Sequence, residues 1–312
     1  MSTGSEIEPE VARLWDGRAF NELDKLEKSL RLQKSTSTSG WPLLFLFYQA
    51  VDSLPNLREG SVADLDKATA DANKWLTESP PSDFAKFLKV DILIAHAWHA
   101  RGYGYADTVS ATQWKEFNAY MDKANEFLMK EKTGLSSNPN WYSVMLDIAN
   151  LRSWPEPAYD ALINEAVRRH GRYLPILTQA VFHFTPRWGG SYEKMDRFIE
   201  SSTSALPSPE GDEIYAVQYS FAFENTLFPD RSHSSVSCIR WLRGYEGIMR
   251  KYATSYNLNH AAFAAVACGN KLVAARYFRQ LGEQPPDSSV WGVGEQDPQA
   301  FYKARRWAVI EH

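Results

Sequence analysis

Helical periodicity is the feature that most constrains what this chain of 312 residues can fold into. Apolar residues recur every three or four positions through most of the sequence, as at Leu23, Leu26 and Leu30. This spacing places them on one face of an α-helix. A half-buried β-strand shows Val, Ile and Thr alternating with polar residues. No stretch of this sequence shows that alternation over the length of a strand. The sequence therefore predicts an all-α protein.

Polar capping residues and prolines divide the chain into about fourteen predicted helices. Ser61, Ser82 and Ser110 each stand directly before an apolar-periodic segment, as helix N-cap residues do. Asn138 followed by Pro139 marks another start. We expect the helix after Ser82 to end near Gly102 or Gly104, because glycine adopts the left-handed conformation at a helix C-terminus. Short connections of this kind make successive helices antiparallel neighbours.

Residues 259–281 form the clearest repeat unit. Small residues, including Ala265 and Ala274, stand where two helices would cross, and Gly269-Asn270 forms the turn between them. This pattern resembles a tetratricopeptide unit, in which small residues let two helices approach closely. The 11 Trp, 15 Tyr and 16 Phe residues suit the gaps between stacked hairpins. We therefore expect a tetratricopeptide-like array of antiparallel helical hairpins, either an α-solenoid or a bent helical bundle.

The array is expected to form one domain over residues 1–312. Within it we distinguish N-terminal helices and a polar loop (1–40), the main array (41–284), and a C-terminal loop with a capping helix (285–312).

Charge and composition exclude several classes of protein. There are 34 Lys and Arg residues against 38 Asp and Glu, a net charge of -4, so we expect no nucleic-acid partner. The longest apolar run, residues 41–51, is too short to cross a bilayer, which needs roughly 20 residues. The polar N-terminus lacks the features of a signal peptide. Cys238 and Cys268 stand alone and are interpreted as buried thiols in a reducing compartment, so we expect a cytoplasmic protein without membrane insertion.

The segment from Ala95 to Val109 holds the densest set of chemically capable side chains. Pro186-Arg-Trp-Gly-Gly190 is a second polar and aromatic turn. Together they supply the candidate residues for binding a ligand or partner: His96, His99, Arg101, Tyr103, Tyr105, Asp107, Arg187 and Trp188.

These residues allow two interpretations. His96 and His99 are three positions apart on a helix, so they could supply two metal ligands, although a catalytic zinc site needs a third. Arg101 or Arg187 could bind a carboxylate or phosphate group. The alternative, which we favour, is structural: the histidines bond to neighbouring groups, and an Arg–Asp pair with Asp107 fixes the stacking of two hairpins. We assign no catalytic residue, no metal ligand and no cofactor.

Three motifs resemble an uncharacterised bacterial domain-of-unknown-function family with tetratricopeptide-like helices. They are Trp-His-Ala-Arg-Gly at residues 98–102, Pro139-Asn-Trp-Tyr142 with Trp154-Pro155, and Pro-Arg-Trp-Gly-Gly at residues 186–190. The resemblance covers roughly residues 85–205. It implies a bacterial all-helical protein and carries over no catalytic residues.

We therefore expect a non-enzymatic protein–protein interaction scaffold, and its most concrete form is an immunity protein that binds and blocks a toxin. The alternative is a metal- or small-ligand-dependent enzyme with a site around His96, His99, Arg101, Asp107 and Arg187. The sequence leaves the oligomeric state open.

Overall fold

The computed structural model describes residues 7–54, 57, 60–79, 81–224, 234–291 and 299–309, and these form helices joined by turns and loops, with no β-sheet. The all-α prediction is confirmed. The described residues divide into two compact units. The N-terminal unit comprises the residues up to Ser35 together with Pro42–Ala166. The C-terminal unit comprises Thr36–Trp41 together with the residues from Val167 onward. The expected single domain over residues 1–312 stays a prediction.

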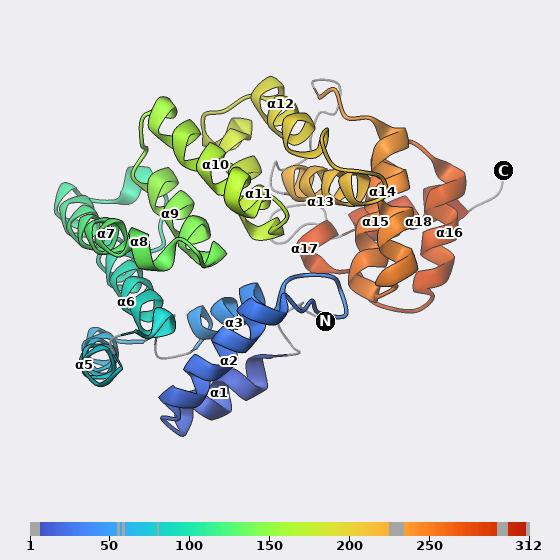
Figure 1. The fold of residues 1–312 in the computed structure, drawn as a ribbon. Helices are drawn as coiled ribbons and strands as arrows, with labels where there is room; N and C mark the ends of the chain where they lie inside the picture. Colours follow the sequence, from blue (N-terminus) through green and yellow to red (C-terminus); the bar gives the residue numbers. More distant parts are fainter. Residues whose placement is uncertain are drawn as a thin grey trace. The chain divides into compact units, whose positions relative to one another are not determined.

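The N-terminal unit is built from hairpins of consecutive helices (Figure 1). Its elements are α1 (Glu8–Asp16), α2 (Phe20–Gln33), α3 (Leu43–Asp52), α5 (Val62–Glu78), α6 (Asp83–Arg101), η1 (Ala106–Thr108), α7 (Ala111–Lys130), α8 (Lys132–Leu135), α9 (Pro139–Leu151) and most of α10 (Glu156–His170).

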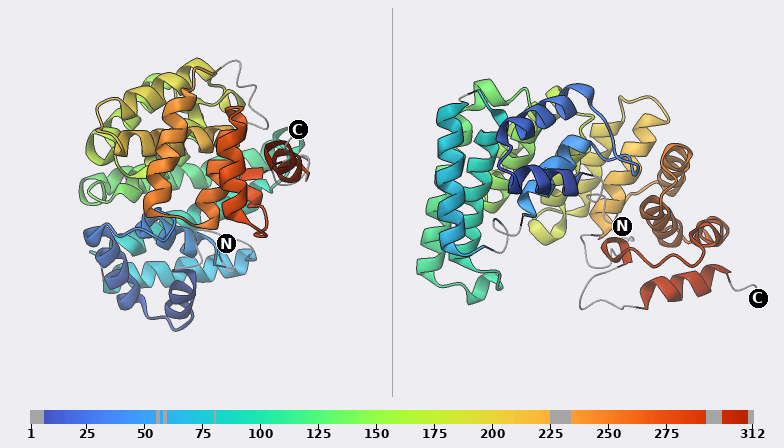
Figure 2. Two further views of the ribbon diagram at one scale, coloured as in Figure 1. Left: turned by 90° about the vertical axis from the view of Figure 1, so that its right-hand side faces the viewer. Right: turned by 90° about the horizontal axis from the view of Figure 1, so that it is seen from below.

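The C-terminal unit continues with further consecutive helices, and α16 and α18 lie side by side (Figure 2). Its elements are α11 (Leu174–Phe184), η2 (Pro186–Trp188), α12 (Tyr192–Thr203), α13 (Glu210–Glu224), α14 (Cys238–Lys251), α15 (Ser255–Ala267), α16 (Lys271–Leu281), α17 (Ser288–Trp291) and α18 (Ala300–Val309).

The predicted N-caps are confirmed. The hydroxyl groups of Ser61 and Ser110 accept from the backbone N–H three residues later, and both residues belong to reciprocal capping boxes. Ser82 caps α6 in the same way with its hydroxyl. The side chain of Asn138 accepts from the Asn140 N–H at the start of α9. These caps satisfy backbone donors that have no partner within the helix, so a local sequence signal is sufficient to place the helix start.

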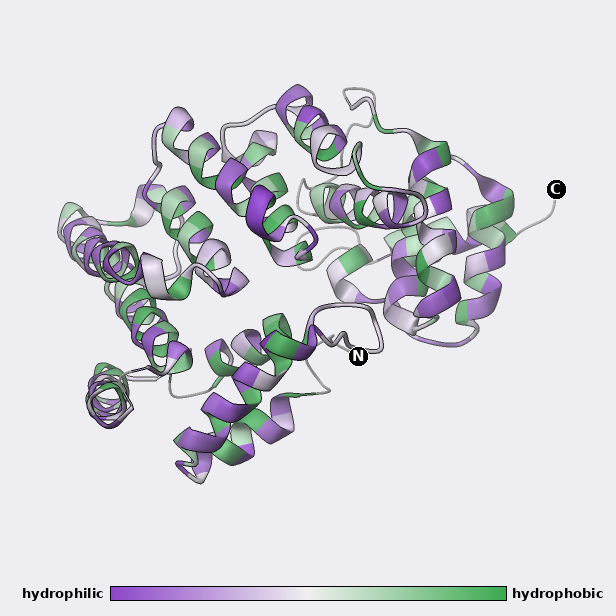
Figure 3. Ribbon diagram, in the orientation of Figure 1, coloured by the Kyte–Doolittle hydropathy of each residue, from purple (hydrophilic) through white to green (hydrophobic). Residues whose placement is uncertain are grey.

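An aromatic core with one buried polar network holds the N-terminal unit together. Most helices carry both hydrophobic and hydrophilic residues along their length, as Figure 3 shows. The rings of Phe47 in α3 and Phe84 in α6 pack edge to face, with 5.0 Å between their centroids. The buried Glu27 carboxylate accepts from the Tyr48 hydroxyl (3.1 Å) and the Asn138 amide (2.8 Å). These bonds compensate the cost of burying a carboxylate, and they tie α2, α3 and the start of α9 together.

A close helix crossing organises the C-terminal unit. A Cβ atom at Gly244 of α14 would lie 2.1 Å from the Asp212 carbonyl oxygen of α13, so only glycine fits there. At the same crossing the Asp212 carboxylate accepts from Arg240 Nε (3.0 Å) and Arg243 Nε (2.7 Å). The close approach thus coincides with a buried carboxylate that joins the two helices.

The hairpin predicted from residues 259–281 is present as α15 and α16. Ala261, Ala265 and Ala274 are fully buried, and the Asn270 side chain caps α16. However, α15 begins at Ser255, four residues before the predicted start. The capping residue is Thr254, whose hydroxyl accepts from the Asn257 N–H. The region expected to be a long loop after Pro285 contains the short helix α17, and the predicted start of the last helix at Pro298 lies outside the described residues.

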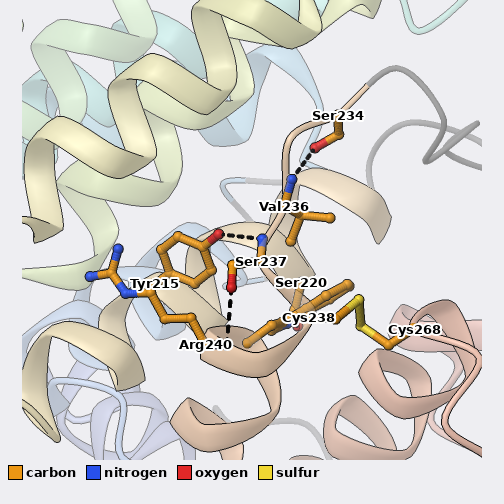
Figure 4. Close-up of a disulfide and its surroundings, with 9 residues drawn as sticks. Tyr215, Ser220, Ser234, Val236, Ser237, Cys238, Arg240 and Cys268 are labelled. Carbon is orange, nitrogen blue, oxygen red and sulfur yellow. Dashed lines mark hydrogen bonds between the residues drawn. A yellow bond between two sulfur atoms is a disulfide. The ribbon is translucent and has the colours of Figure 1, made fainter.

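The interpretation of the cysteines as buried reduced thiols is wrong. Cys238 and Cys268 form a disulfide with their Cα atoms 5.7 Å apart, and both are half-buried (Figure 4). Cys238 begins α14 and Cys268 is the C-cap residue of α15, so the antiparallel packing of these helices brings together residues that are 30 positions apart. Disulfides persist in oxidising compartments. This bond weighs against the cytoplasmic location expected from the sequence, which stays a prediction.

Within the described part of the chain, no helix is both long and apolar enough to cross a membrane.

Candidate functional site

The candidate segment comprises the last residues of α6, the loop that follows it and η1. Gly102 terminates the helix with φ at 76°, a backbone conformation that favours glycine, which confirms the predicted glycine stop. The Gln113 side chain, on the first turn of α7, donates to the Arg101 carbonyl (3.0 Å) and accepts from Ser110. The loop between α6 and α7 is therefore held at its start and at its end.

Arg101 is the centre of this loop. Its guanidinium carbon lies over two indole rings, 5.1 Å from the centroid of the Trp98 ring and 4.8 Å from that of Trp114. The same group donates to the carbonyl oxygens of Gly102 (2.9 Å) and Gly104 (3.1 Å). Two cation–π contacts and two charge-assisted hydrogen bonds fix both the side chain and the loop. The predicted Arg101–Asp107 pair is replaced by these carbonyl contacts.

Two tyrosines project from the fixed loop into solvent. Tyr103 is 76% exposed. Its ring stacks on that of Trp98, with 6.1 Å between the ring centroids and 4° between the ring planes. Tyr105 is 80% exposed. We call Trp98, Arg101, Tyr103, Tyr105 and Trp114 the aromatic end of the α6–α7 hairpin. Two of its four rings, those of Tyr103 and Tyr105, are mostly exposed to solvent.

The two histidines lie in different environments. His96 is 7% exposed, stacks on Tyr120 at 5.0 Å, and has Nε2 3.9 Å from an Asp66 carboxylate oxygen. Burial lowers the pKa of His96, partly offset by the Asp66 charge. His99 is exposed. One helical turn therefore separates a packed ring from a solvated one. Among the described residues, no three His, Cys, Asp or Glu side chains are grouped so that they could hold a metal ion.

The remaining candidates do not add to this loop. Asp107 is exposed on η1. Arg187 and Trp188 belong to the other unit, on η2, and the side chain of Arg187 lies outside the described residues. Trp188 is 41% exposed and its ring lies 4.8 Å from that of Phe182. A joint site with His96 and His99 stays a prediction.

Three aspartates of the N-terminal unit form an electrostatic cluster that the sequence reasoning missed. Burial among the surrounding helices, together with repulsion from Asp147, raises the pKa of Asp52 to about 7. The pKa of Asp91 is raised by burial and by Asp52. These residues come from α3, α6 and α9, so no local sequence motif indicates that they lie close together. Protein surrounds the Asp52 carboxyl group closely enough to raise its pKa, but the residue as a whole keeps an exposed surface, so water screens part of the repulsion.

A pocket of about 550 Å³ in the C-terminal unit was also missed. Its walls include Trp41, Leu174, Val217, Phe221, Tyr252 and Tyr256. They come from the 36–41 segment, α11, α13, the end of α14 and α15. The pocket brings together residues more than two hundred positions apart in the chain, such as Trp41 and Tyr256. The sequence therefore showed only that these segments are rich in aromatic residues, and not that they form one pocket.

No protein-family model and no curated protein matches the chain. The resemblance to a bacterial domain-of-unknown-function family therefore rests on the three motifs alone and stays a prediction.

Proposed function

We propose that this protein is a non-enzymatic helical-repeat scaffold that binds a protein partner through the aromatic end of the α6–α7 hairpin. The observation that carries the proposal is the exposure of Tyr103 and Tyr105 on a loop that Arg101 holds in place. Tyrosine, tryptophan and arginine are enriched where proteins contact each other. A surface that is ordered before binding loses less conformational entropy when its partner docks.

The chemistry of this end favours binding over catalysis. The Arg101 guanidinium is already engaged by two rings and two carbonyl oxygens, so it is poorly placed to bind a substrate carboxylate or phosphate. His96 is packed against Tyr120, whereas His99 is exposed. A protein partner that binds here would contact the exposed rings of Tyr103 and Tyr105 and the loop between α6 and α7.

The finer form of the proposal is toxin immunity in a bacterium. It adds the requirement that the partner be a toxin whose active surface is covered by this loop, and that loss of this protein sensitise the cell to it. Its support is the analogy with helical scaffolds that act as adaptors and immunity proteins.

A position-specific photo-cross-link tests the proposal. We replace Tyr105 by the photoreactive residue p-benzoylphenylalanine and irradiate intact cells. The control places the same residue at Leu32, which is 68% exposed on α2 of the same unit. We expect one discrete adduct from position 105 and none of that mass from position 32.

A second variant ties the adduct to the aromatic end. Tyr103→Ala in the Tyr105 photoreactive background removes a neighbouring ring without touching the cross-linker, and we expect the adduct yield to fall about fivefold or more, as for an interface hot spot. Equal adducts from positions 105 and 32, or an unchanged yield in the Tyr103→Ala variant, would refute the proposed surface. Mass spectrometry of the adduct decides between a toxin and another partner.

A further inference from the structure

The pocket of the C-terminal unit is preformed and mostly apolar. The rings of five Trp, Phe and Tyr residues line it: Trp41, Phe221, Tyr245, Tyr252 and Tyr256. Its volume of about 550 Å³ is in the range of small-molecule sites, roughly 300–1,000 Å³. Ring-lined walls favour flat ligands, because aromatic faces and edges stack against planar groups.

The 36–41 segment that closes one side is fixed in place. The Asn257 amide nitrogen donates to the Ser39 carbonyl (3.1 Å) and to the Tyr252 carbonyl (2.8 Å). The Trp41 indole nitrogen donates to the Tyr256 hydroxyl (3.2 Å). The chamber is thus walled by bonded parts of one unit and requires no rearrangement to exist.

The charged residues of the lining neutralise one another. Arg172 pairs with Glu210 at 2.7 Å, and Lys251 pairs with Glu213 at 2.7 Å. Two cations and two carboxylates leave no net charge for an ionic ligand to complement. An ion entering the pocket would lose its hydration without gaining a counter-charge, which is costly.

Ser220 and Asn257 are among the buried polar residues of the lining, and both retain unused hydrogen-bonding capacity. The Ser220 hydroxyl oxygen accepts from the Tyr245 hydroxyl (2.6 Å) and the Trp241 indole nitrogen (3.2 Å), which leaves its own proton to donate. Asn257 uses its amide nitrogen in two bonds, and its amide oxygen accepts none from the described residues. Ser220 is 2% exposed and Asn257 is 4% exposed.

We propose that this pocket binds an uncharged, flat, mostly aromatic molecule that carries a carbonyl group and an N–H group, as an aromatic amide or lactam does. The rings supply the apolar contact area, Ser220 donates to the carbonyl, and the Asn257 amide oxygen accepts from the N–H. The site is independent of the proposed partner surface on the other unit.

A matched probe series tests the ligand class. Calorimetry with the full chain compares 2-naphthamide with the anion 2-naphthoate, with the cation 2-naphthylmethylammonium, and with octanamide, which keeps the amide but has no ring. We expect 2-naphthamide to bind at least about tenfold more tightly than each of the other three, which corresponds to ~1.4 kcal/mol. In the wild-type protein, we expect the Trp41 indole N–H resonance to shift on addition of 2-naphthamide.

Filling the pocket tests the location. Val217→Trp places a large ring into the chamber from α13, and we expect it to weaken 2-naphthamide binding about tenfold or more, ~1.4 kcal/mol. Leu272→Trp is the matched control, because Leu272 is 79% exposed on α16 of the same unit. If Val217→Trp fails to fold, Val217→Met fills less volume and is expected to weaken binding in the same direction.

Three results would overturn the inference. The first is that none of the four probes binds the wild-type chain or shifts the Trp41 resonance. The second is that the anion, the cation or octanamide binds as tightly as 2-naphthamide. The third is equal 2-naphthamide affinity in the folded Val217 variant and the Leu272→Trp control.

Discussion

The buried carboxylate of Asp212 should stabilise the C-terminal unit by an amount that depends on pH. Its hydrogen bond from Arg243 is the largest contribution to an Asp212 pKa lowered to about 2 from the ordinary 3.8, and burial opposes it. Ser208 and Arg240 lower the pKa further. The perturbation is Asp212→Asn, which keeps the shape of the side chain and removes its charge.

The size of the effect follows from the pKa difference. A fall from 3.8 to about 2 corresponds to about 2.4 kcal/mol at pH 7, since each pKa unit is worth ~1.36 kcal/mol. Because Arg243 is 54% exposed, solvent screening makes this an upper figure. The folded-state pKa is depressed, so the stabilisation is complete above pH 3.8 and is lost as pH falls towards 2. At about pH 3, about 1.1 kcal/mol of it should already be gone.

Urea unfolding at pH 7 and at about pH 3 provides the measurement. We expect Asp212→Asn to cost about 2 kcal/mol at pH 7 and about half as much at the lower pH. Glu246→Gln is the control: it breaks the surface pair with Arg276, in which both side chains are close to half exposed, and should cost less than about 0.5 kcal/mol. A cost for Asp212→Asn that is the same at both pH values, or no larger than that of the control, would refute the electrostatic reasoning.

Three further predictions concern other parts of the molecule. Replacing Cys238 and Cys268 by Ser should cost about 3.6 kcal/mol, from the entropy of a 30-residue loop, and reduction of the wild type should match it in thermal melts. Asp52→Asn should stabilise the protein at pH 8 but not at about pH 4, because a raised pKa of the carboxyl group means that its ionisation destabilises the folded state. An equal change in the free energy of unfolding at both pH values would contradict this. Trp98→Ala should cost about 2 kcal/mol and the more exposed Trp188→Ala about 1, and chemical denaturation should preserve that order.

The sequence predicted most of the helix boundaries of this protein because they are local. The hydroxyl of Ser110 lies three residues from the N–H it caps, and Gly102 ends α6 through its own backbone. Likewise, the small residues of the α15–α16 hairpin signal a close helix crossing within one short stretch. The start of α15 was misplaced, because Thr254 caps the helix four residues earlier than predicted, and the short helices α8 and α17 were not predicted.

The candidate segment was located from the sequence, but the roles within it were not. His96 and His99 share a helical turn, yet one packs on Tyr120 and the other faces solvent, because helix α7 covers only one side of α6. Arg101 was expected to pair with Asp107. It is instead held by Trp114, a residue of the next helix, and by loop carbonyls.

What the sequence determined by itself is the helical class, the caps and the presence of an exposed polar and aromatic loop, all of which depend on neighbours within a turn or two. The tertiary structure alone decided that Cys238 meets Cys268, that Asp212 lies between two arginines, and that Trp41 and Tyr256 line one pocket. These contacts join residues far apart in the chain. They depend on which helix faces pack, and periodicity identifies an apolar face without naming its partner.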